Sequence, residues 1–281
     1  MNILVKSKRH RVFIGMLPAP LMFLFVVFFG NYCVIEAQTV GELIAQGDNY
    51  HKQFDTYNAF RSYKAASELD STNFDVLWKM AGELIDMGNE LPKSEDQSNK
   101  YHDAEIIARK AIQLNPNHSK GHVMLALAIE KTALTETGQA RIKALNQSRL
   151  AAEKALEINP NESVGYAILG RWNLEMANTA WLTKTFSKLF VVSIPPASYE
   201  KAAEQFSKAI NISPACLSYY LEIGKTYVLL EKWSEAGEAF QKIVDLPTLQ
   251  KSDSKWQREA KHYLLLLQQG NHSELVDSIK E

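Results

Sequence analysis

Residues 59–73 read AFRSYKAASELDSTN, and the same pattern returns as AEIIARKAIQLNPN at 104–117, LAAEKALEINPN at 150–161 and AAEQFSKAINISP at 202–214. In each stretch small or aromatic residues recur three or four positions apart, which places them on one face of a helix. A polar turn follows, in three cases with a proline, which cannot continue the helix. The four stretches are therefore predicted to be the second helix of a repeated helix pair.

A first helix is expected before each of these, and its small residue gives the period of the repeat. The small residues lie 35, 44, 44 and 54 positions apart and are Gly47, Gly82, Ala126, Gly170 and Gly224. Small residues let two antiparallel helices approach closely, and aromatic residues fill the gaps between them. Units of about 34 residues are typical of tetratricopeptide repeats. The longer spacings predict insertions between the two helices of units two, three and four.

These features predict an all-α fold, a right-handed superhelix of about five tetratricopeptide-like (TPR-like) helix pairs within residues 40–281. A C-terminal capping helix is expected over residues 252–268, with Tyr263, Leu264 and Leu267 on its apolar face. Such a cap is needed because the last apolar surface of a repeat array would otherwise meet water.

Composition and motifs exclude several classes of function. The chain has 281 residues, 46% of them hydrophobic, and a formal net charge of −1. No cluster of Lys and Arg stands out, so nucleic-acid binding is not expected. The sequence has no G-x-S-x-G, H-E-x-x-H, phosphate-loop or C-x-x-C motif, so we predict no enzyme activity and no cofactor. His118 and His122 share a helix face, but without a recognisable third ligand they predict no metal site.

Residues 1–37 have the pattern of a signal peptide. Basic residues precede an apolar run over residues 12–30, and Ala37 stands at the small-residue cleavage position. We therefore expect export to the periplasm or cell envelope, which would leave Cys216 without a disulfide partner in the chain. The alternative is that residues 12–30 stay as a membrane anchor, since about 18 apolar residues can just span a bilayer.

Unit four carries a more specific pattern. It contains Gly170-Arg171-Trp172, Trp181, Leu189-Phe190, Pro195-Pro196, Glu200, Ala202, Phe206, Lys208-Ala209 and Pro214, and Gly224-Lys225-Thr226-Tyr227 and Leu246-Pro247 follow. With this order the chain resembles the regulator of microtubule dynamics protein family. The resemblance implies a non-enzymatic TPR-like domain, which in eukaryotic members is associated with microtubules and organelle membranes. The export pattern departs from that role, because an exported protein does not meet tubulin, and it suggests an exported bacterial relative.

The helical register places a row of first-helix side chains along the concave face of the superhelix. The row consists of Lys79, Glu83, Val123, Leu127, Arg171, Leu174, Lys225 and Val228. We predict that this groove binds a protein, or a peptide in extended or helical form. The alternative is an ordinary solvated surface. Because the charges are mixed, capture of a peptide carboxylate by a basic clamp is disfavoured.

A second candidate site is the apolar stretch over residues 181–194, which includes Trp181, Phe186, Leu189 and Phe190. The functional interpretation is a lipophilic or peptide-binding wall, or a contact with the membrane surface. The alternative is that the stretch extends the first helix of unit four and packs back on the array.

Arg171 and Trp172 test the helical register of unit four. Arg171 is predicted to lie on the concave wall, and Trp172 to point away from it, toward the inserted segment or the neighbouring unit. Trp172→Ala should then remove core packing worth about 3–5 kcal/mol. Arg171→Ala should leave stability nearly unchanged.

The predicted signal peptide can be tested directly. If residues 1–37 are removed on export, sequencing of the mature N-terminus from the envelope fraction should begin at Gln38. An intact Met1 in the membrane fraction would support the anchor instead. Full-length protein in the cytosol would contradict both interpretations.

Overall fold

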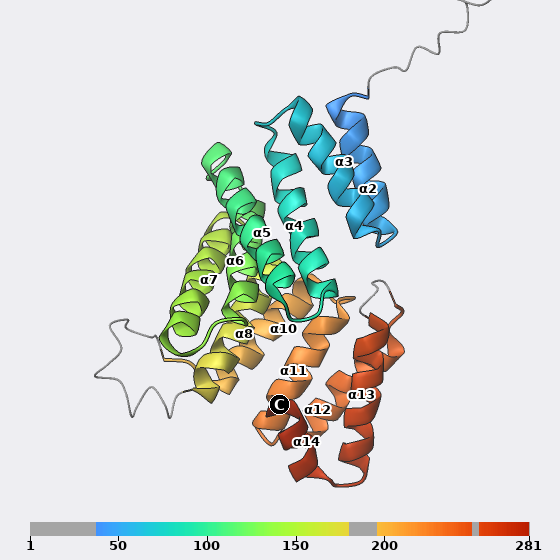
Figure 1. Cartoon of the computed structure of the whole chain (residues 1–281). Coiled ribbons are helices and arrows are strands. Elements are labelled where there is room, and N and C mark those ends of the chain that lie inside the picture. Colours follow the sequence, from blue (N-terminus) through green and yellow to red (C-terminus); the bar gives the residue numbers. More distant parts are fainter. Residues whose placement is uncertain (1–37, 180–195, 249–252, 281) are drawn as a thin grey trace, which may run out of the picture. The chain divides into compact units, whose positions relative to one another are not determined.

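The computed structural model describes residues 38–179, 196–248 and 253–280, which fold into twelve helices and no strand (Figure 1). The described helices belong to one compact unit. Consecutive helices pack against each other as α2 (Val40–Lys52) on α3 (Thr56–Leu69), α4 (Phe74–Glu90) on α5 (Glu95–Leu114), α6 (Ser119–Ala133) on α7 (Gly138–Ile158), α8 (Ser163–Asn178) on α10 (Tyr199–Ile212) and α11 (Leu217–Leu229) on α12 (Trp233–Asp245). The five helix pairs predicted from the repeat are therefore confirmed.

The first helices of the five pairs are α2, α4, α6, α8 and α11. Side chains of Thr39, Asp55, Asn73, Ser94 and Ser198 each accept a hydrogen bond from the backbone N–H three residues on, which starts a helix. Two further helices, α13 (Asp253–Gln268) and α14 (His272–Lys280), follow the five pairs.

The extra residues of units two and three lengthen the helices and do not form loops. Helices α4, α5 and α7 contain 17, 20 and 21 residues, against 13 in α2 and 14 in α3. Only residues 91–94 and 134–137 connect the paired helices of these two units. The prediction of insertions between the helices was wrong here, because spacing counts residues and does not distinguish a longer helix from a longer loop.

Within units one, four and five, a glycine of the first helix packs against an aromatic ring of the second. A Cβ atom built on Gly47 would lie 2.4 Å from the Tyr63 ring. The equivalent distance is 2.5 Å from Gly170 to Phe206, and 2.5 Å from Gly224 to Phe240. All three rings are almost fully buried. Glycine is required at these positions because any larger residue would push the two helices apart.

Units two and three close differently, because alanine replaces the ring. Ala108 and Ala152 stand in the ring position of their second helices, and both pack in one cluster with Ala126. In unit two the ring is that of Tyr101, which lies two turns before Ala108 on α5. It packs against Gly88, where a Cβ atom built on the glycine would lie 2.4 Å from the ring. Small residues thus permit the close approach in each pair, but at different heights along the helices.

Apolar clusters cross the borders between units. One cluster contains buried residues from α4, α5, α6, α7 and α8, so that three units share one core. Trp172 is 5% exposed and packs against residues of α6 and α7 such as Ala133 and Leu145. Its Nε1 donates to Asn146 Oδ1 at 3.2 Å. This burial agrees with the predicted direction of Trp172, away from the surface and toward the neighbouring unit.

The C-terminal cap is confirmed as α13 and extended by α14. Tyr263 and Leu266 are buried on α13, whereas Leu264 and Leu267 are partly buried. Leu275 of α14 is fully buried in the same cluster. The predicted face therefore lacked Leu266, and the short helix α14 was not predicted.

Two predicted segments, residues 1–37 and the apolar stretch 181–194, lie outside the described residues. Among the helices that the structure does describe, none combines the length and the apolar character needed to cross a membrane.

The contact between Gly170 and Phe206 gives a stability test. Gly170→Ala places a methyl group 2.5 Å from the ring, so we expect a loss of about 1–3 kcal/mol in the free energy of unfolding. The matched control is Gly237→Ala on α12, where the nearest atom is Leu267 Cδ1 at 3.8 Å. This control should gain about 0.5–1 kcal/mol, because alanine favours the helix. Urea denaturation measures both, and equal effects would contradict the assigned contact.

Candidate functional site

The first helices form a continuous surface along the array. Helices α4, α6, α8, α11 and α13 contact one another in turn, and α2 reaches α4 through side chains. We call this surface the first-helix face. All eight residues of the predicted row lie on these helices, and the five of them predicted to contact a ligand are Lys79, Glu83, Leu127, Arg171 and Lys225.

A pocket of about 420 Å³ opens at the N-terminal end of this face, between α2, α4 and α6. It contains three of the predicted residues, Lys79, Glu83 and Leu127. The remaining lining residues are Asp48, His51, Lys52, Tyr63, Trp78, Gly82, Ile85, Asp86 and Met124. We call it the N-terminal pocket. It combines apolar side chains with charges of both signs.

Asp48 anchors one wall of the N-terminal pocket. The Tyr63 hydroxyl donates to Asp48 Oδ1 at 2.6 Å, and Lys79 Nζ donates to the same oxygen at 2.5 Å. Burial opposes ionisation of Asp48, but the hydrogen bonds from Lys79 and Tyr63 outweigh it and lower the pKa of this carboxyl group. Lys79 Nζ also lies 5.1 Å from the centroid of the Trp78 ring. The lysine is therefore held between an acid and an aromatic face.

One turn further along α2 and α4, the pocket is lined by His51, Glu83 and Asp86. His51 Nδ1 lies 2.7 Å from Glu83 Oε1, and this hydrogen bond raises the pKa of His51. The Glu83 side chain is only 4% exposed, and its Oε2 is buried without a hydrogen-bond partner. Desolvation of the carboxyl group and the charge of Glu83 raise the pKa of Asp86 to about 6, although the residue as a whole is exposed. Two carboxylates thus share this part of the pocket with one imidazole.

The centre of the first-helix face is closed by ion pairs. Arg171 on α8 donates from Nε and Nη2 to the two carboxylate oxygens of Glu130 on α6, both at 2.8 Å. Burial raises the pKa of Glu222 on α11, and the charge of Arg171 opposes that rise. Arg171 therefore lies on the first-helix face, but its guanidinium group already makes a bidentate ion pair with Glu130.

The C-terminal end of the face repeats this arrangement. Lys225 Nζ on α11 lies 2.6 Å from Glu259 Oε1 on α13, and the Tyr263 hydroxyl donates to the same oxygen at 2.8 Å. Two further members of the predicted row, Val123 and Val228, are fully buried in the core and do not line a surface. The four charged residues of the predicted row are thus engaged between helices, and Leu127 is half-buried and apolar.

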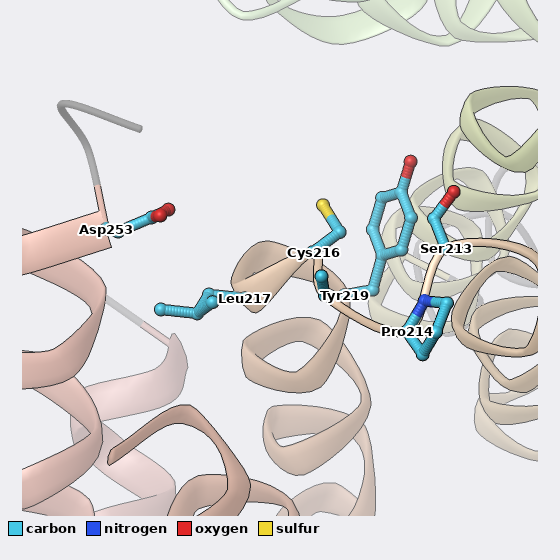
Figure 2. Close-up of a pocket in the computed structure, with 7 residues that line it drawn as sticks. Ser213, Pro214, Cys216, Leu217, Tyr219 and Asp253 are labelled. Atoms are coloured by element: carbon cyan, nitrogen blue, oxygen red, sulfur yellow. The ribbon is translucent and has the colours of Figure 1, made fainter. Parts of the chain in front are cut away.

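A second pocket, of about 450 Å³, lies where the turn from α10 into α11 meets the start of α13. Figure 2 shows the Cys216 thiol, the Tyr219 hydroxyl and the Ser213 hydroxyl pointing to the same side, with Asp253 across from them. Ser213 Oγ donates to Ser163 Oγ at 2.9 Å, and Ser163 Oγ lies 3.3 Å from the Tyr219 hydroxyl. Burial raises the pKa of Tyr219 to about 12, so this group stays a neutral hydrogen-bonding hydroxyl.

Sequence reasoning missed His51, Asp48 and Asp86 as pocket residues. His51 and Glu83 are 32 positions apart, and no short motif joins them. The histidines that the sequence did single out serve the turn before α6. His118 Nδ1 accepts from the Lys120 backbone N–H at 3.3 Å, and His122 Nε2 lies 2.9 Å from the Pro116 carbonyl oxygen.

Comparison with known proteins identifies related chains. A family model described as "Regulator of microtubule dynamics protein 1-3" matches residues 43–268. Regulator of microtubule dynamics protein 1 of Pongo abelii is 25% identical over 238 residues, which cover 83% of this chain and 74% of the relative. The protein of the same name from Mus musculus is 26% identical over 231 residues, covering 80% and 74%.

Among solved structures, a thermophilic TPR protein of Thermus thermophilus matches with a TM-score of 0.60 at 14% identity. The match covers 81% of this chain and 100% of that protein. At this identity the likeness concerns the fold alone, and it confirms the TPR-like superhelix expected from the repeats.

The sequence predicted that Arg171→Ala would leave stability nearly unchanged, but the ion pair of Arg171 with Glu130 makes that prediction wrong. Glu130 is 9% exposed in its side chain, so Arg171→Ala leaves a buried carboxylate without its partner. We expect a loss of stability that approaches the 3–5 kcal/mol of a fully buried pair, comparable with Trp172→Ala. Arg171→Met combined with Glu130→Met should recover part of that loss, because both charges of the pair are then removed together, while Glu222 loses the nearby charge of Arg171.

Urea denaturation of Arg171→Met, Glu130→Met and the double variant measures the coupling between the two residues. The control is Arg109→Ala, which breaks a more exposed pair with Glu105 within α5 and should cost about 0.5 kcal/mol or less. Losses of equal size for Arg109→Ala and Arg171→Ala would show that the pair at the centre of the face is unimportant.

Proposed function

Because the chain belongs to the regulator of microtubule dynamics family, whose model spans residues 43–268, we propose that it is a non-enzymatic interaction scaffold. The scaffold binds a protein or peptide on its first-helix face, and the N-terminal pocket receives one side chain of that partner. The observation that carries the proposal is the composition of this pocket. It offers half-buried apolar side chains beside charged groups, which is the mixture found at protein interfaces.

The apolar part of the N-terminal pocket defines the anchor. Trp78, Met124 and Leu127 line it and are each only half-buried. Tryptophan is enriched among residues that dominate binding energy, and methionine adapts to partners of different shape. Ion pairs occupy the centre and the C-terminal end of the face. The N-terminal pocket is therefore the position at which an apolar side chain of the partner gains most from burial.

Membership of the family supports a role as an interaction scaffold but does not identify the binding partner. The relatives are named regulators of microtubule dynamics, whereas residues 1–37 of this chain carry the pattern of an export signal. We therefore propose a location in the periplasm or cell envelope, with a partner of that compartment in place of tubulin. The lipid-binding alternative rests on Trp181, Phe186, Leu189 and Phe190, which lie outside the described residues.

Site-specific photo-crosslinking tests the binding surface. A benzophenone amino acid at Leu127 of the full-length protein should form an adduct with the partner in cells under ultraviolet light. The same residue at Leu150, which is 55% exposed on α7, serves as the control and should form none. Trp78→Ala in the Leu127 crosslinker should abolish the adduct while circular dichroism shows that the helices persist. Equal adducts at both positions, or an adduct that survives Trp78→Ala, would contradict the proposal.

A further inference from the structure

Three side chains of metal-binding type meet on one wall of the N-terminal pocket. His51 comes from α2, and Glu83 and Asp86 come from successive turns of α4. One ligand atom from each, a ring nitrogen and two carboxylate oxygens, lies within 4.8 Å of the others. The three-residue spacing of the two acids puts them on the same side of α4, where α2 presents the histidine.

Glu83 gives a second and independent observation. Its side chain is 4% exposed, and Oε1 is occupied by His51 at 2.7 Å, but Oε2 is buried without a hydrogen-bond partner. A buried carboxylate oxygen that has lost water and gained no donor is costly. Because Glu83 lines the pocket, a cation bound there would offset the cost of burying Oε2 without a hydrogen-bond donor.

The neighbouring lysine does not serve as this cation. Lys79 Nζ is 2.5 Å from Asp48 Oδ1 and lies over the Trp78 and Tyr63 rings, at 5.1 and 5.7 Å from their centroids. These contacts engage Lys79 one turn away from Glu83 on α4, and no hydrogen bond joins it to Glu83 Oε2.

The ligand types indicate which cation fits. One imidazole nitrogen with two carboxylate oxygens suits zinc and similar transition metals, whereas calcium and magnesium prefer oxygen ligands throughout. Zinc holds such ligands at about 2.0–2.2 Å. His51 and Asp86 are exposed residues, so an ion in solution can reach their ligand atoms. Three protein ligands also leave a coordination position directed to the pocket.

We propose that His51, Glu83 and Asp86 bind one divalent cation of the zinc class in the N-terminal pocket. The ion bridges α2 and α4, and so fixes the first unit of the array against the second. Its open coordination position accepts water or a ligand atom from a bound partner.

Calorimetry with the full-length protein tests the site. The protein is freed of any affinity tag, stripped with EDTA and titrated with zinc chloride, with magnesium chloride as comparison. We expect one zinc per chain and no magnesium binding. His51→Ala and Glu83→Gln should each weaken zinc binding at least tenfold, because each removes a ligand. Since no partner is added, failure of this test leaves the proposed scaffold function untouched, and failure of the crosslinking test leaves the metal site untouched.

The matched control is the double variant His118→Ala/His122→Ala, which removes the other histidine pair and should bind zinc like the unchanged protein. Cobalt provides a second readout, because its visible absorption spectrum should show nitrogen ligation that His51→Ala removes. Absence of zinc binding, binding unaltered in His51→Ala and Glu83→Gln, or binding lost in the histidine control would each overturn the proposal.

Discussion

The close approach of two helices within each unit is the constraint on which the rest of the array depends. It requires glycine where a ring of the second helix meets the first, as at Gly47 against Tyr63, and only small residues where alanine replaces the ring, as at Ala126 and Ala152. Once a pair has closed in this way, its outer sides remain apolar, and the next unit must cover them. The cores are accordingly shared, and one cluster joins α4, α5, α6, α7 and α8. A single unit therefore cannot form a core of its own, and the cap of α13 and α14 completes the last one.

The shared core also explains why charges gather on the first-helix face. Successive first helices stand close together there, so a long charged side chain on one reaches its partner on the next, as Arg171 reaches Glu130 and Lys225 reaches Glu259. Paired in this way, a partly buried charge is tolerated. The N-terminal pocket differs because Glu83 keeps one oxygen without a partner. It is this mismatch between burial and pairing that sets the pocket apart from the rest of the face.

The repeat and its register could be predicted from sequence because they depend on local spacing. Alanines and rings three or four residues apart fix one helix face, and this reasoning placed Gly47, Gly170 and Gly224 against their second helices correctly. Lengths were not predictable in the same way, since additional residues fit equally into a loop or a longer helix. The ion-pair partners of the charged residues could not be predicted from the sequence either. Register puts Arg171 on a face, but Glu130 becomes its neighbour only through the stacking of α8 on α6. His51 and Glu83 meet for the same reason.

The ion pairs along the first-helix face differ in their exposure to solvent. At the centre both partners are mostly buried, Arg171 at 28% and Glu130 at 9% exposure, whereas toward α2 the buried Glu83 is paired with a His51 that is 59% exposed. Dissolved ions screen exposed pairs far more than buried ones, over a Debye length of about 8 Å at physiological ionic strength. Salt should therefore weaken the pair that joins α2 to α4 more than the pair that joins α6 to α8. The attachment of the first helix is thus the contact along this face that responds most to ionic strength.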